Sequence, residues 1–569
     1  MADLQFVSAE MQREQMSKKQ KQKNDDIAAE KIRDFGRRSS MRGNFETYWK
    51  EVAERIDPVN SKNFNAYNQQ QTTQGEKRTE LIYDSTATIA LQRFTSILDS
   101  LLTPRNQMWH RLIADNEKLS KSRNVRLYFE EVNRLLFKYR YAPRANFSSQ
   151  NQQNFKSLGA YGNGAMFIDD LAGGERGVRY KNIHLSQLFF AENHQGLIDD
   201  VFRFFPLTSR QALQKWGEEC PEQIKAAAKV NPDQEFYFLH CVHPKKEYDY
   251  GRKDFRGMPF ASYYIEMQSK QMLSEGGYNS FPYAISRYEQ AENEVYGRSP
   301  AMDVLPSIKT LNEQKKTLLK QGHRALDPVL LAYDDGVLDN FSMSPGALNA
   351  GGVTADGRPL VHALPTGNIA AGKETMDDER AVVNDAFLVT IFQILTETPA
   401  MTATEVLERT REKGILLAPT VGRQQSECLG PMIEREIDIL SRQGILPPMP
   451  QELIEAQGEY KVVYDSPLSR AQRAEEASGL MRTVEAAMNV AATTMNPNIL
   501  DHFNWDVIVP EMADIQGVPE SWLNSPDAIA QLREQRAQMQ QAQMANQALP
   551  GTAAIMKAQA ASKKAGAEG

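Results

Sequence analysis

Apolar residues recur at two different periods along the chain, and the change of period separates helical parts from a strand-rich part. Helical spacing predicts helices over 45–56, 87–101, 125–136 and 147–158. Short apolar runs between turn residues predict strands over 178–183, 188–192, 201–207, 235–242, 261–266 and 283–288, with a short helix over 209–216. Gly159, Gly162 and Gly164 mark a helix, a turn and a strand at the boundary. Helices followed by strands within one region predict an α+β fold that is mainly helical over the whole chain.

The segment 296–406 has the most regular organisation. Apolar residues at heptad-like spacing predict a helix over 305–324, and Asp327-Pro328 ends it because the residue before a proline avoids the helical region. Residues 327–372 alternate short apolar runs with Gly and Pro turns. A second helix is expected over 375–395, capped by Thr375 and carrying acids in its first turn, and a third begins near 402. The chain therefore sends out a helix, forms a small module and returns along another helix.

The outgoing helix carries a high density of positive charge. Its polar faces hold Lys309, Lys316, Lys320 and Arg324, which are opposed almost only by Glu313. Such a face is either plain solvated surface or a contact surface for another helix or for DNA. We expect a contact surface, because isolated surface helices commonly place acids beside their basic residues.

The order of these segments resembles that of the portal, or head-to-tail connector, proteins of short-tailed, podovirus-type bacteriophages. The matching motifs are Ile-Tyr-Asp-Ser-Thr-Ala at 82–87, Leu-Leu-Thr-Pro at 101–104, Tyr-Gly-Arg-Ser-Pro at 296–300, Leu-Asp-Pro at 326–328 and Met-Thr-Ala-Thr-Glu-Val at 401–406. No single motif is specific, but their order and spacing together are. The resemblance covers 45–467 and leaves both ends of the chain unmatched.

The resemblance implies a portal fold, assembled as a ring, with a wing, a two-helix stem, a clip and a helical crown and barrel. It divides this sequence into a basic N-terminal arm (1–43), the wing (44–297 and 404–465), two stem helices (298–326 and 373–395), the clip (327–372), the tunnel loop (396–403), and the crown with the C-terminal barrel and tail (466–569). The expected tunnel-loop residues are Thr396, Glu397, Thr398, Pro399 and Met401. The expected stem contacts between subunits are Val304, Ile308, Leu311, Leu318, Phe387 and Ile391, and the residues expected to face DNA are Lys309, Lys316, Lys320 and Arg324.

The same resemblance implies the function of a portal protein. A dodecameric ring would occupy one capsid vertex of the virion, at the head–tail junction, and nucleate head assembly after synthesis in the host cytoplasm. Double-stranded DNA would pass through its channel during packaging and ejection. The implied partners are further copies of the chain, that DNA, the terminase large subunit, tail adaptor and tail tube proteins, and major capsid and scaffolding proteins, with no membrane.

Composition agrees with this reading in three respects. The net charge of −7 creates no overall basic field that would hold the chain on nucleic acid. The sequence contains no run of 18 apolar residues, so no membrane span is expected. Three widely spaced cysteines indicate a reducing compartment and no disulfide framework.

Both ends of the chain have biased composition. The first 43 residues, with their Lys-rich run at 18–23, are expected to form a solvated arm, the alternative being an arm that contacts DNA or a neighbouring subunit. Good helix formers dominate from 531, so we expect a helix that is stable to about Pro550 only when copies pack together in the ring.

Two motifs could carry chemistry, and neither is convincing. Residues 367–374 match a phosphate-binding loop up to Glu374, where a Ser or Thr is required to coordinate magnesium. His240-Cys241-Val242-His243 lies in an expected strand, which turns His240 and Cys241 to opposite faces, and further zinc ligands are lacking nearby. We therefore expect no catalytic, cofactor or metal site and no enzyme. The alternatives left open are a nucleotide-hydrolysing packaging enzyme using 367–373, and a scaffold or adaptor protein without a channel.

Overall fold

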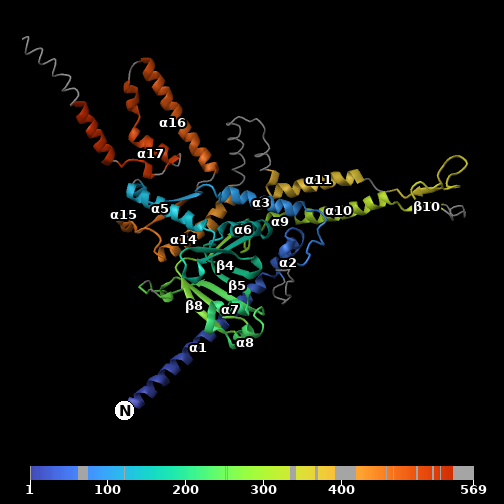
Figure 1. Cartoon of the computed structure of the whole chain (residues 1–569), viewed down its shortest axis with the longest axis horizontal. Coiled ribbons are helices and arrows are strands. Elements are labelled where there is room, and N and C mark those ends of the chain that lie inside the picture. The colour runs from blue at the N-terminus through green and yellow to red at the C-terminus, as the bar shows by residue number, and fades with distance from the viewer. Residues whose placement is uncertain are drawn as a thin grey trace, which may run out of the picture. The chain divides into compact units, whose positions relative to one another are not determined.

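The computed structural model describes residues 2–541, except 62–63, 65–74, 121, 250, 253, 333–340, 366–368, 391–417, 457, 465–466, 495–496, 516–517, 519 and 526. The chain forms two compact units, and Figure 1 shows their elements. The first unit comprises Met1–Trp109 and Leu136–Leu446. The second comprises His110–Leu135 and Pro447–Gly569.

Helices and two antiparallel sheets make up the first unit. Its helices are α1 (Ala2–Met41), α2 (Gly43–Arg55), α3 (Thr86–Leu102), the end of α5 (Arg123–Arg140), α6 (Phe147–Tyr161), α7 (Ser209–Trp216), α8 (Glu222–Val230), α9 (Pro300–Asp303), α10 (Leu305–Leu326), α11 (Ile369–Ala386) and α14 (Gly430–Arg442). A π-helical turn, Gln425–Leu429, leads into α14. The combination of helices and sheets confirms the expected α+β class.

The first sheet has three strands in the order β3-β2-β9, and the second has five in the order β4-β5-β6-β7-β8. Their bounds are β2 (Asn163–Asp170), β3 (Val178–Asn182), β4 (Leu188–Glu192), β5 (Ile198–Thr208), β6 (Glu235–Pro244), β7 (Phe260–Glu266), β8 (Met272–Tyr278) and β9 (Tyr283–Arg287). All six expected strands are present. β8 was not expected from the sequence, because Ser274, Glu275, Gly276 and Gly277 give it no apolar alternation.

Helices cover both faces of the five-stranded sheet. On one face, Ala212 and Trp216 of α7 and Ile224 of α8 form a core with Phe205 and Phe238. On the other, Ala28 and Phe35 of α1 form a core with Phe189, Leu239 and Cys241. Neighbouring residues of β6 enter opposite cores because side chains alternate along a strand.

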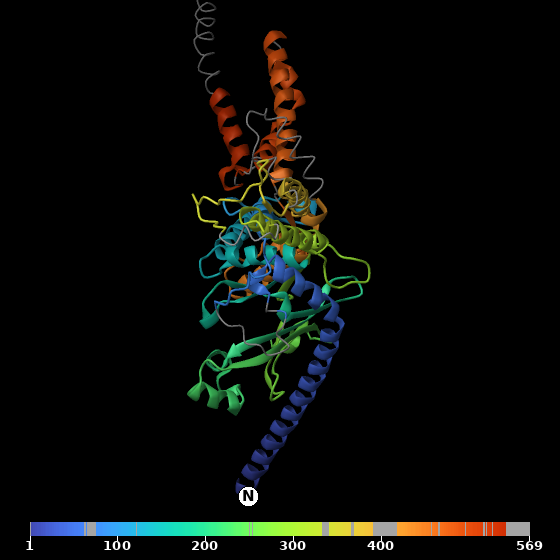
Figure 2. The same cartoon turned by 90° about the vertical axis from the view of Figure 1, so that its right-hand side faces the viewer.

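The packing of α1 corrects the expected solvated N-terminal arm. Ala28 and Phe35 are fully buried, and Figure 2 shows the N-terminal end of α1 projecting away from the sheets. Ordered structure therefore begins well before Phe45. The helical spacing of Ala28, Ile32 and Phe35 was the available signal, and the surrounding charged residues concealed it.

The boundary between α6 and β2 is the expected helix, turn and strand. Gly162 caps α6 with φ 76°, a left-handed conformation that suits glycine. A Cβ atom on Gly162 would lie 2.4 Å from the carbonyl oxygen of Gly297. This close approach joins the helix–strand boundary to the segment that precedes α9.

The second unit contains a two-stranded sheet and helices. β1 (His110–Ala114) pairs with β12 (Tyr460–Tyr464). Its helices are α4 (Glu117–Ser120), the first part of α5, α15 (Gln451–Glu455), α16 (Pro467–Thr494) and α17 (Trp505–Ile515). Residues 527–541 are also helical, and the rest of the expected C-terminal helix lies outside the described residues.

Candidate functional site

The candidate site is the pair of helices α10 and α11, with the short sheet at its far end and the anchoring contacts at its base. Figure 1 shows the two helices side by side, and β10 (Leu330–Ala332) lies beyond their far end. β10 pairs antiparallel with β11 (Val361–Ala363). A helix therefore leaves the body and another returns beside it, as the sequence indicated.

Aromatic packing fixes the start of the outgoing segment. The ring of Tyr296 lies 5.3 Å from that of Trp49 and 4.5 Å from that of Phe190, between centroids. The amide of Gly297 donates to Asn163 Oδ1 at 2.9 Å. The Tyr-Gly pair of the motif at 296–300 is therefore a docking contact, where the aromatic ring fills a core position and the glycine permits close approach.

The next residues of the motif begin the helix. Ser299 Oγ accepts the amide of Met302 at 3.1 Å and donates to the carbonyl of Ala160 at 2.8 Å. Pro300 occupies the first turn, where its missing N–H has no cost. A serine cap followed by proline thus fixes both the position and the direction of α9, which leads directly into α10.

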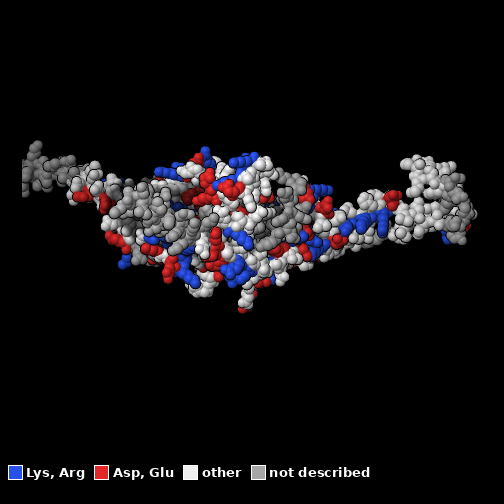
Figure 3. All heavy atoms as spheres, turned by 90° about the horizontal axis from the view of Figure 1, so that it is seen from below, with Lys and Arg blue, Asp and Glu red and all other residues white. Residues whose placement is uncertain are grey.

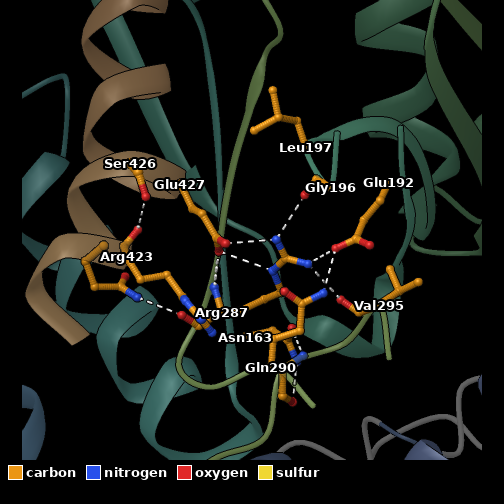
Figure 4. A network of polar contacts seen from close by, with 12 residues as sticks. Asn163, Glu192, Gly196, Leu197, Arg287, Gln290, Val295, Arg423, Ser426 and Glu427 are labelled. Carbon is orange, nitrogen blue, oxygen red and sulfur yellow. Dashed lines mark hydrogen bonds and ion pairs between the residues drawn. The ribbon is translucent and has the colours of Figure 1, made fainter. Parts of the chain in front are cut away.

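A buried arginine ties together the elements behind this base (Figure 4). Arg287, at the end of β9, is 3% exposed, and its Nη2 donates to Glu427 Oε1 at 2.8 Å and to the carbonyl of Gly196 at 3.2 Å. Its Nη1 donates to Glu192, at the end of β4. The backbone amide of Arg287 also donates to Glu427 at 2.8 Å. One guanidinium therefore joins both sheets to the π-helical turn, whose geometry aims Glu427 at it.

A second set of contacts holds both helices of the pair to the segment before α3. Asn312 Oδ1 on α10 accepts the amides of Tyr83 and Asp84 at 2.8 and 3.1 Å. Arg380 Nη2 on α11 donates to Asp84 Oδ2 at 2.6 Å. Burial raises the pKa of Asp84, but hydrogen bonds from Thr86 and Arg380 outweigh it and hold the pKa below its usual value. The motif at 82–87 is therefore a clamp for the helix pair.

The returning helix differs from its expected bounds. It begins at Ile369 instead of Thr375, because Gly372 packs against Leu318 of α10 and lets the two helices run together earlier. It ends at Ala386, and Leu388 follows with φ 60°. Residues 389–390 are helical again, and 391–395 lie outside the described residues. Phe387 is buried, with its ring 6.1 Å from that of Phe94 on α3. Phe387 is thus a core residue of its own chain.

Three residues of the predicted intersubunit stripe are also core residues. Val304, Ile308 and Leu311 are buried, at 8%, 1% and 1% exposure, within a single copy of the chain. Leu318 is half-buried against Gly372. These side chains stabilise the base of the helix pair, and their burial leaves little of them for a neighbouring copy. Ile391, with all five tunnel-loop residues, lies outside the described residues.

The exposed surfaces of the two helices carry opposite charge. α10 holds five Lys or Arg residues and one acid, whereas α11 holds five acids and two basic residues. Basic side chains gather along α10 in the view from below (Figure 3). The exposed charged residues are Lys320, Arg324 and Glu313 on α10, and Glu374, Asp377, Asp378, Asp385 and Lys373 on α11.

The charged residues of α10 and α11 form ion pairs with other segments or within their own helix. Lys309 pairs with Glu51 of α2, which is the acidic partner that the sequence analysis missed, and Lys316 lies 3.6 Å from Glu313. Arg380 pairs with Asp84 and Asp377. Among the described residues, no ion pair joins α10 to α11. A groove of about 700 Å³ lies along the two helices and is lined by Lys309, Glu313 and Leu318 of α10 and Thr375 of α11.

Apolar side chains are exposed on the segment between the helices. Leu326 and Leu348 are 88% and 95% exposed. Further exposed apolar residues there are Val329, Leu331, Phe341, Met343, Val353 and Leu364. An apolar surface of this extent is typical of a contact with another protein.

The two motifs weighed for chemistry have structural roles where they are described. Lys373 and Glu374 lie inside α11, and Thr375 Oγ1 bonds the carbonyl of Ala371, so Thr375 is not the helix cap that was expected. His240 stacks on Tyr264 at 4.0 Å and bonds the hydroxyls of Tyr283 and Ser262 at 2.7 and 3.0 Å. Cys241 faces α1 on the other side of the sheet, as strand alternation predicted.

The described part of the chain contains neither a cluster of metal ligands nor a helix that could cross a membrane. No three His, Cys, Asp or Glu side chains come together there as metal ligands. None of the described helices combines the length and apolarity needed to cross a bilayer.

The fold places the protein in a structural class, that of an α+β body from which an anchored antiparallel helix pair projects. Comparison with known proteins identifies the family within this structural class. The family of bacteriophage head to tail connecting proteins matches residues 30–523, and the chain belongs to this family. It is similar to a probable portal protein of Bordetella phage BPP-1, at 27% identity over 89% of this chain and 91% of the relative. It is also similar to a portal protein of Salmonella phage epsilon15, at 25% identity over 90% and 92% of the two chains.

Proposed function

We propose that copies of this chain form the portal ring of a tailed phage, with an axial channel through which double-stranded DNA enters and leaves the head. Family membership supports the role of a connector between head and tail. The observation that most directly supports a ring is the division of charge between α10 and α11. A role in packaging and ejection places the ring at a capsid vertex of the virion.

The opposite charges of the two helices support contact between successive copies. A basic face on one side of the pair and an acidic face on the other make a heterologous contact, in which each copy uses two different surfaces. Such contacts generate a closed ring when the rotation between copies closes. Since no described ion pair joins α10 to α11 within the chain, both faces remain available for a neighbour.

The chain is proposed to divide into the parts of a portal. Residues 44–297 and 404–465 are assigned to the wing, 298–326 and 373–395 to the stem, and 396–403 to the tunnel loop. The clip is assigned to 327–372, although α11 already begins at Ile369. Residues 466–569 are assigned to the crown and the C-terminal barrel and tail. The clamp at Asp84 supports the stem assignment, because it fixes both helices at the end where they join the body.

The proposed channel holds DNA weakly. Lys320 and Arg324 are the exposed cations at the far end of α10, and Lys309 is engaged by Glu51. Few phosphate contacts per subunit, on a chain of net charge −7, allow DNA to slide, whereas many would oppose movement. Because the proposed contact between copies engages Lys320 and Arg324, little of their charge is left to hold DNA.

The exposed apolar segment is proposed as the docking surface for successive partners. Leu326, Met343 and Leu348 offer apolar area at the far end of the helix pair. The partners assigned to it are the terminase large subunit during packaging, and tail adaptor or tail tube proteins afterwards. The remaining assigned partners are capsid and scaffolding proteins, and twelve copies per ring is the proposed stoichiometry.

Charge exchange between the two helices tests the ring. One variant, Lys315→Glu with Lys320→Glu and Arg324→Glu, makes α10 acidic. Another, Glu374→Lys with Asp378→Lys and Asp385→Lys, makes α11 basic. Each alone places like charges across every contact between copies, so rings should be lost, and a chain carrying both sets should regain them.

The measurement is native mass spectrometry with negative-stain imaging of the purified protein. Reversal of Lys229, Lys246 and Arg256, which lie outside the helix pair, is the matched control and should leave rings unchanged. Rings that persist in both single sets would contradict the proposed contact. Particles without a central channel would instead favour a scaffold or adaptor protein.

A further inference from the structure

A polar cavity in the first unit lies apart from the helix pair. Its volume is about 410 Å³, within the range of small-molecule sites. Its walls come from α6, β3, β5 and the residues after α2, and the charged side chains that line it are Asp57, Lys156, Lys181 and Arg203. Three of these four are cations.

Among the charged residues of the cavity, Arg203 gives the strongest indication of an anion site. It is 7% exposed, with its guanidinium 4.4 Å from the ring centre of Phe205. Its side chain hydrogen-bonds the neutral Tyr283, and its Nε has no hydrogen-bond partner among the described residues. No carboxylate lies within ion-pair distance of it in the described part of the chain. A buried cation without a counter-charge is costly, so this arrangement calls for an anion in the cavity.

Lys181 adds to the same positive field. Loss of hydration lowers the pKa of Lys181, and the nearby Arg203 and Arg179 lower it further. The charges that act on Lys181 are therefore cations, which oppose its ionisation, and an anion beside it would restore the balance.

The acid in the cavity wall is already engaged. Asp57 accepts Lys156 Nζ at 2.7 Å, Asn60 Nδ2 at 2.7 Å and the hydroxyl of Tyr161 at 3.0 Å. His184 adds no charge, because burial lowers its pKa to about 4. The neighbouring sequence 62–74 contains no Asp or Glu. The charge of Arg203 and Lys181 is therefore left for a ligand.

We propose that this cavity binds a small phosphate-type anion through Arg203, Lys181 and Lys156. Two uncompensated cations match the charge of a phosphate dianion. Its tetrahedral oxygens can accept donors from three walls at once, whereas a carboxylate offers two oxygens in one plane. The cavity is of small-molecule size, which excludes a DNA duplex from its interior.

The test is titration of the purified full-length protein with inorganic phosphate, at ionic strength held constant with chloride, followed by calorimetry. We expect one saturable site per chain. Lys181→Gln removes an exposed charge and should weaken phosphate binding about tenfold, whereas Lys229→Gln, outside the cavity, should bind as the parent does. A nucleoside monophosphate in a parallel arm distinguishes a phosphate ester from the free ion.

A second variant separates binding from folding. Arg203→Met should abolish phosphate binding, and without phosphate its melting temperature should equal or exceed that of the parent, since an unpaired buried charge has been removed. A lower melting temperature there would make Arg203 a structural residue and overturn the proposal. So would the absence of saturable phosphate binding, equal binding by Lys181→Gln, or preferential binding of duplex DNA that Lys181→Gln removes. Ring formation is measured separately, so failure here leaves the portal proposal intact.

Discussion

Asp84 and Arg380 are separated by 296 residues in sequence, yet the Arg380 guanidinium donates to the Asp84 carboxylate at 2.6 and 3.3 Å. The same backbone segment donates two amides to Asn312 on the other helix of the pair. A single short segment therefore holds both α10 and α11, and a disturbance at Asp84 would reach both helices.

Removal of the arginine from this clamp should be costly. Arg380→Gln leaves the carboxylate of Asp84, 5% exposed, without its charged partner, and we expect a loss of about 2–3 kcal/mol in the free energy of unfolding. Asp377→Asn removes only the exposed second partner of Arg380 and should cost less than about 0.5 kcal/mol. Denaturant unfolding measures both, and equal losses would show that the clamp does not stabilise the helix pair.

The close approach at Gly162 gives a second prediction. Gly162→Ala places a Cβ atom 2.4 Å from the backbone oxygen of Gly297 at φ 76°, so the base of the helix pair must shift. We expect a loss of several kcal/mol in stability. Gly173, with φ 84° and no atom within 4 Å, is the matched control, and Gly173→Ala should cost only about 1 kcal/mol. Thermal unfolding distinguishes a backbone clash from simple left-handed strain, which would make the two losses equal.

Burial of stripe residues changes how the helix pair should respond to inserted charge. Leu311 is 1% exposed within one copy, so Leu311→Asp should unfold the first unit by placing a charge in its core. Leu319, on the same helix, is 46% exposed, so Leu319→Asp should leave the monomer folded. Circular dichroism and ring imaging of both variants check this. Loss of rings with intact folding in Leu319→Asp would place that face in the contact between copies, and intact rings in Leu311→Asp would contradict the packing.

Three histidines, of which His240 is buried and His184 and His243 are half-buried, predict a loss of stability in acid. Burial lowers the pKa of His184 and His243 to about 4 and holds that of His240 well below its usual value, with Lys215 and Arg203 adding to the effect at His240. The unfolded chain takes up protons on these groups near pH 6.5, and the folded chain does not. The contribution of these histidines to stability is therefore complete above pH 6.5 and falls as the pH drops towards 4, by up to about 1.4 kcal/mol per pH unit for each histidine.

The pH dependence can be assigned to one residue. His240→Gln should flatten the change of unfolding free energy between pH 6.5 and 5 by about 1.4 kcal/mol per pH unit, whatever its effect on absolute stability. His194 is exposed, and His194→Gln should leave the slope unchanged. Denaturant unfolding at several pH values supplies the slopes, and an unaltered slope in His240→Gln would show that this histidine does not resist protonation.

Elements whose signals are local were predicted well. α7 has its expected bounds because Thr208 and Gln211 form a capping box and Gly217 ends the helix, all within ten residues. The outgoing helix was also found, since Ser299, Pro300 and Asp327 mark its ends. Helix caps and turn residues act through the nearest backbone groups, so they can be read without the rest of the fold.

Elements whose position depends on residues far away in the sequence were predicted poorly. The prediction of a solvated arm was wrong for α1, because Phe35 is buried by the rings of Phe189 and Phe202. These residues are far from Phe35 in the sequence, so no local pattern indicates the contact. The start of α11 was predicted too late in the sequence, because Gly372 packs against Leu318 of α10 and this contact cannot be seen locally. Lys309 was expected to face DNA, and its partner Glu51 lies 258 residues earlier.

The sequence by itself determined the α+β class, the six principal strands, the helix pair with its intervening module, and the family resemblance, because periodicity, caps and turns are local properties of a chain. Only the tertiary structure decided which apolar residues of the pair are already buried, which cations have partners, and that Arg203 and Lys181 share a cavity without a free acid. Those outcomes depend on residues brought together across hundreds of positions. Burial and ion pairing depend on these tertiary contacts, and no local sequence pattern encodes them.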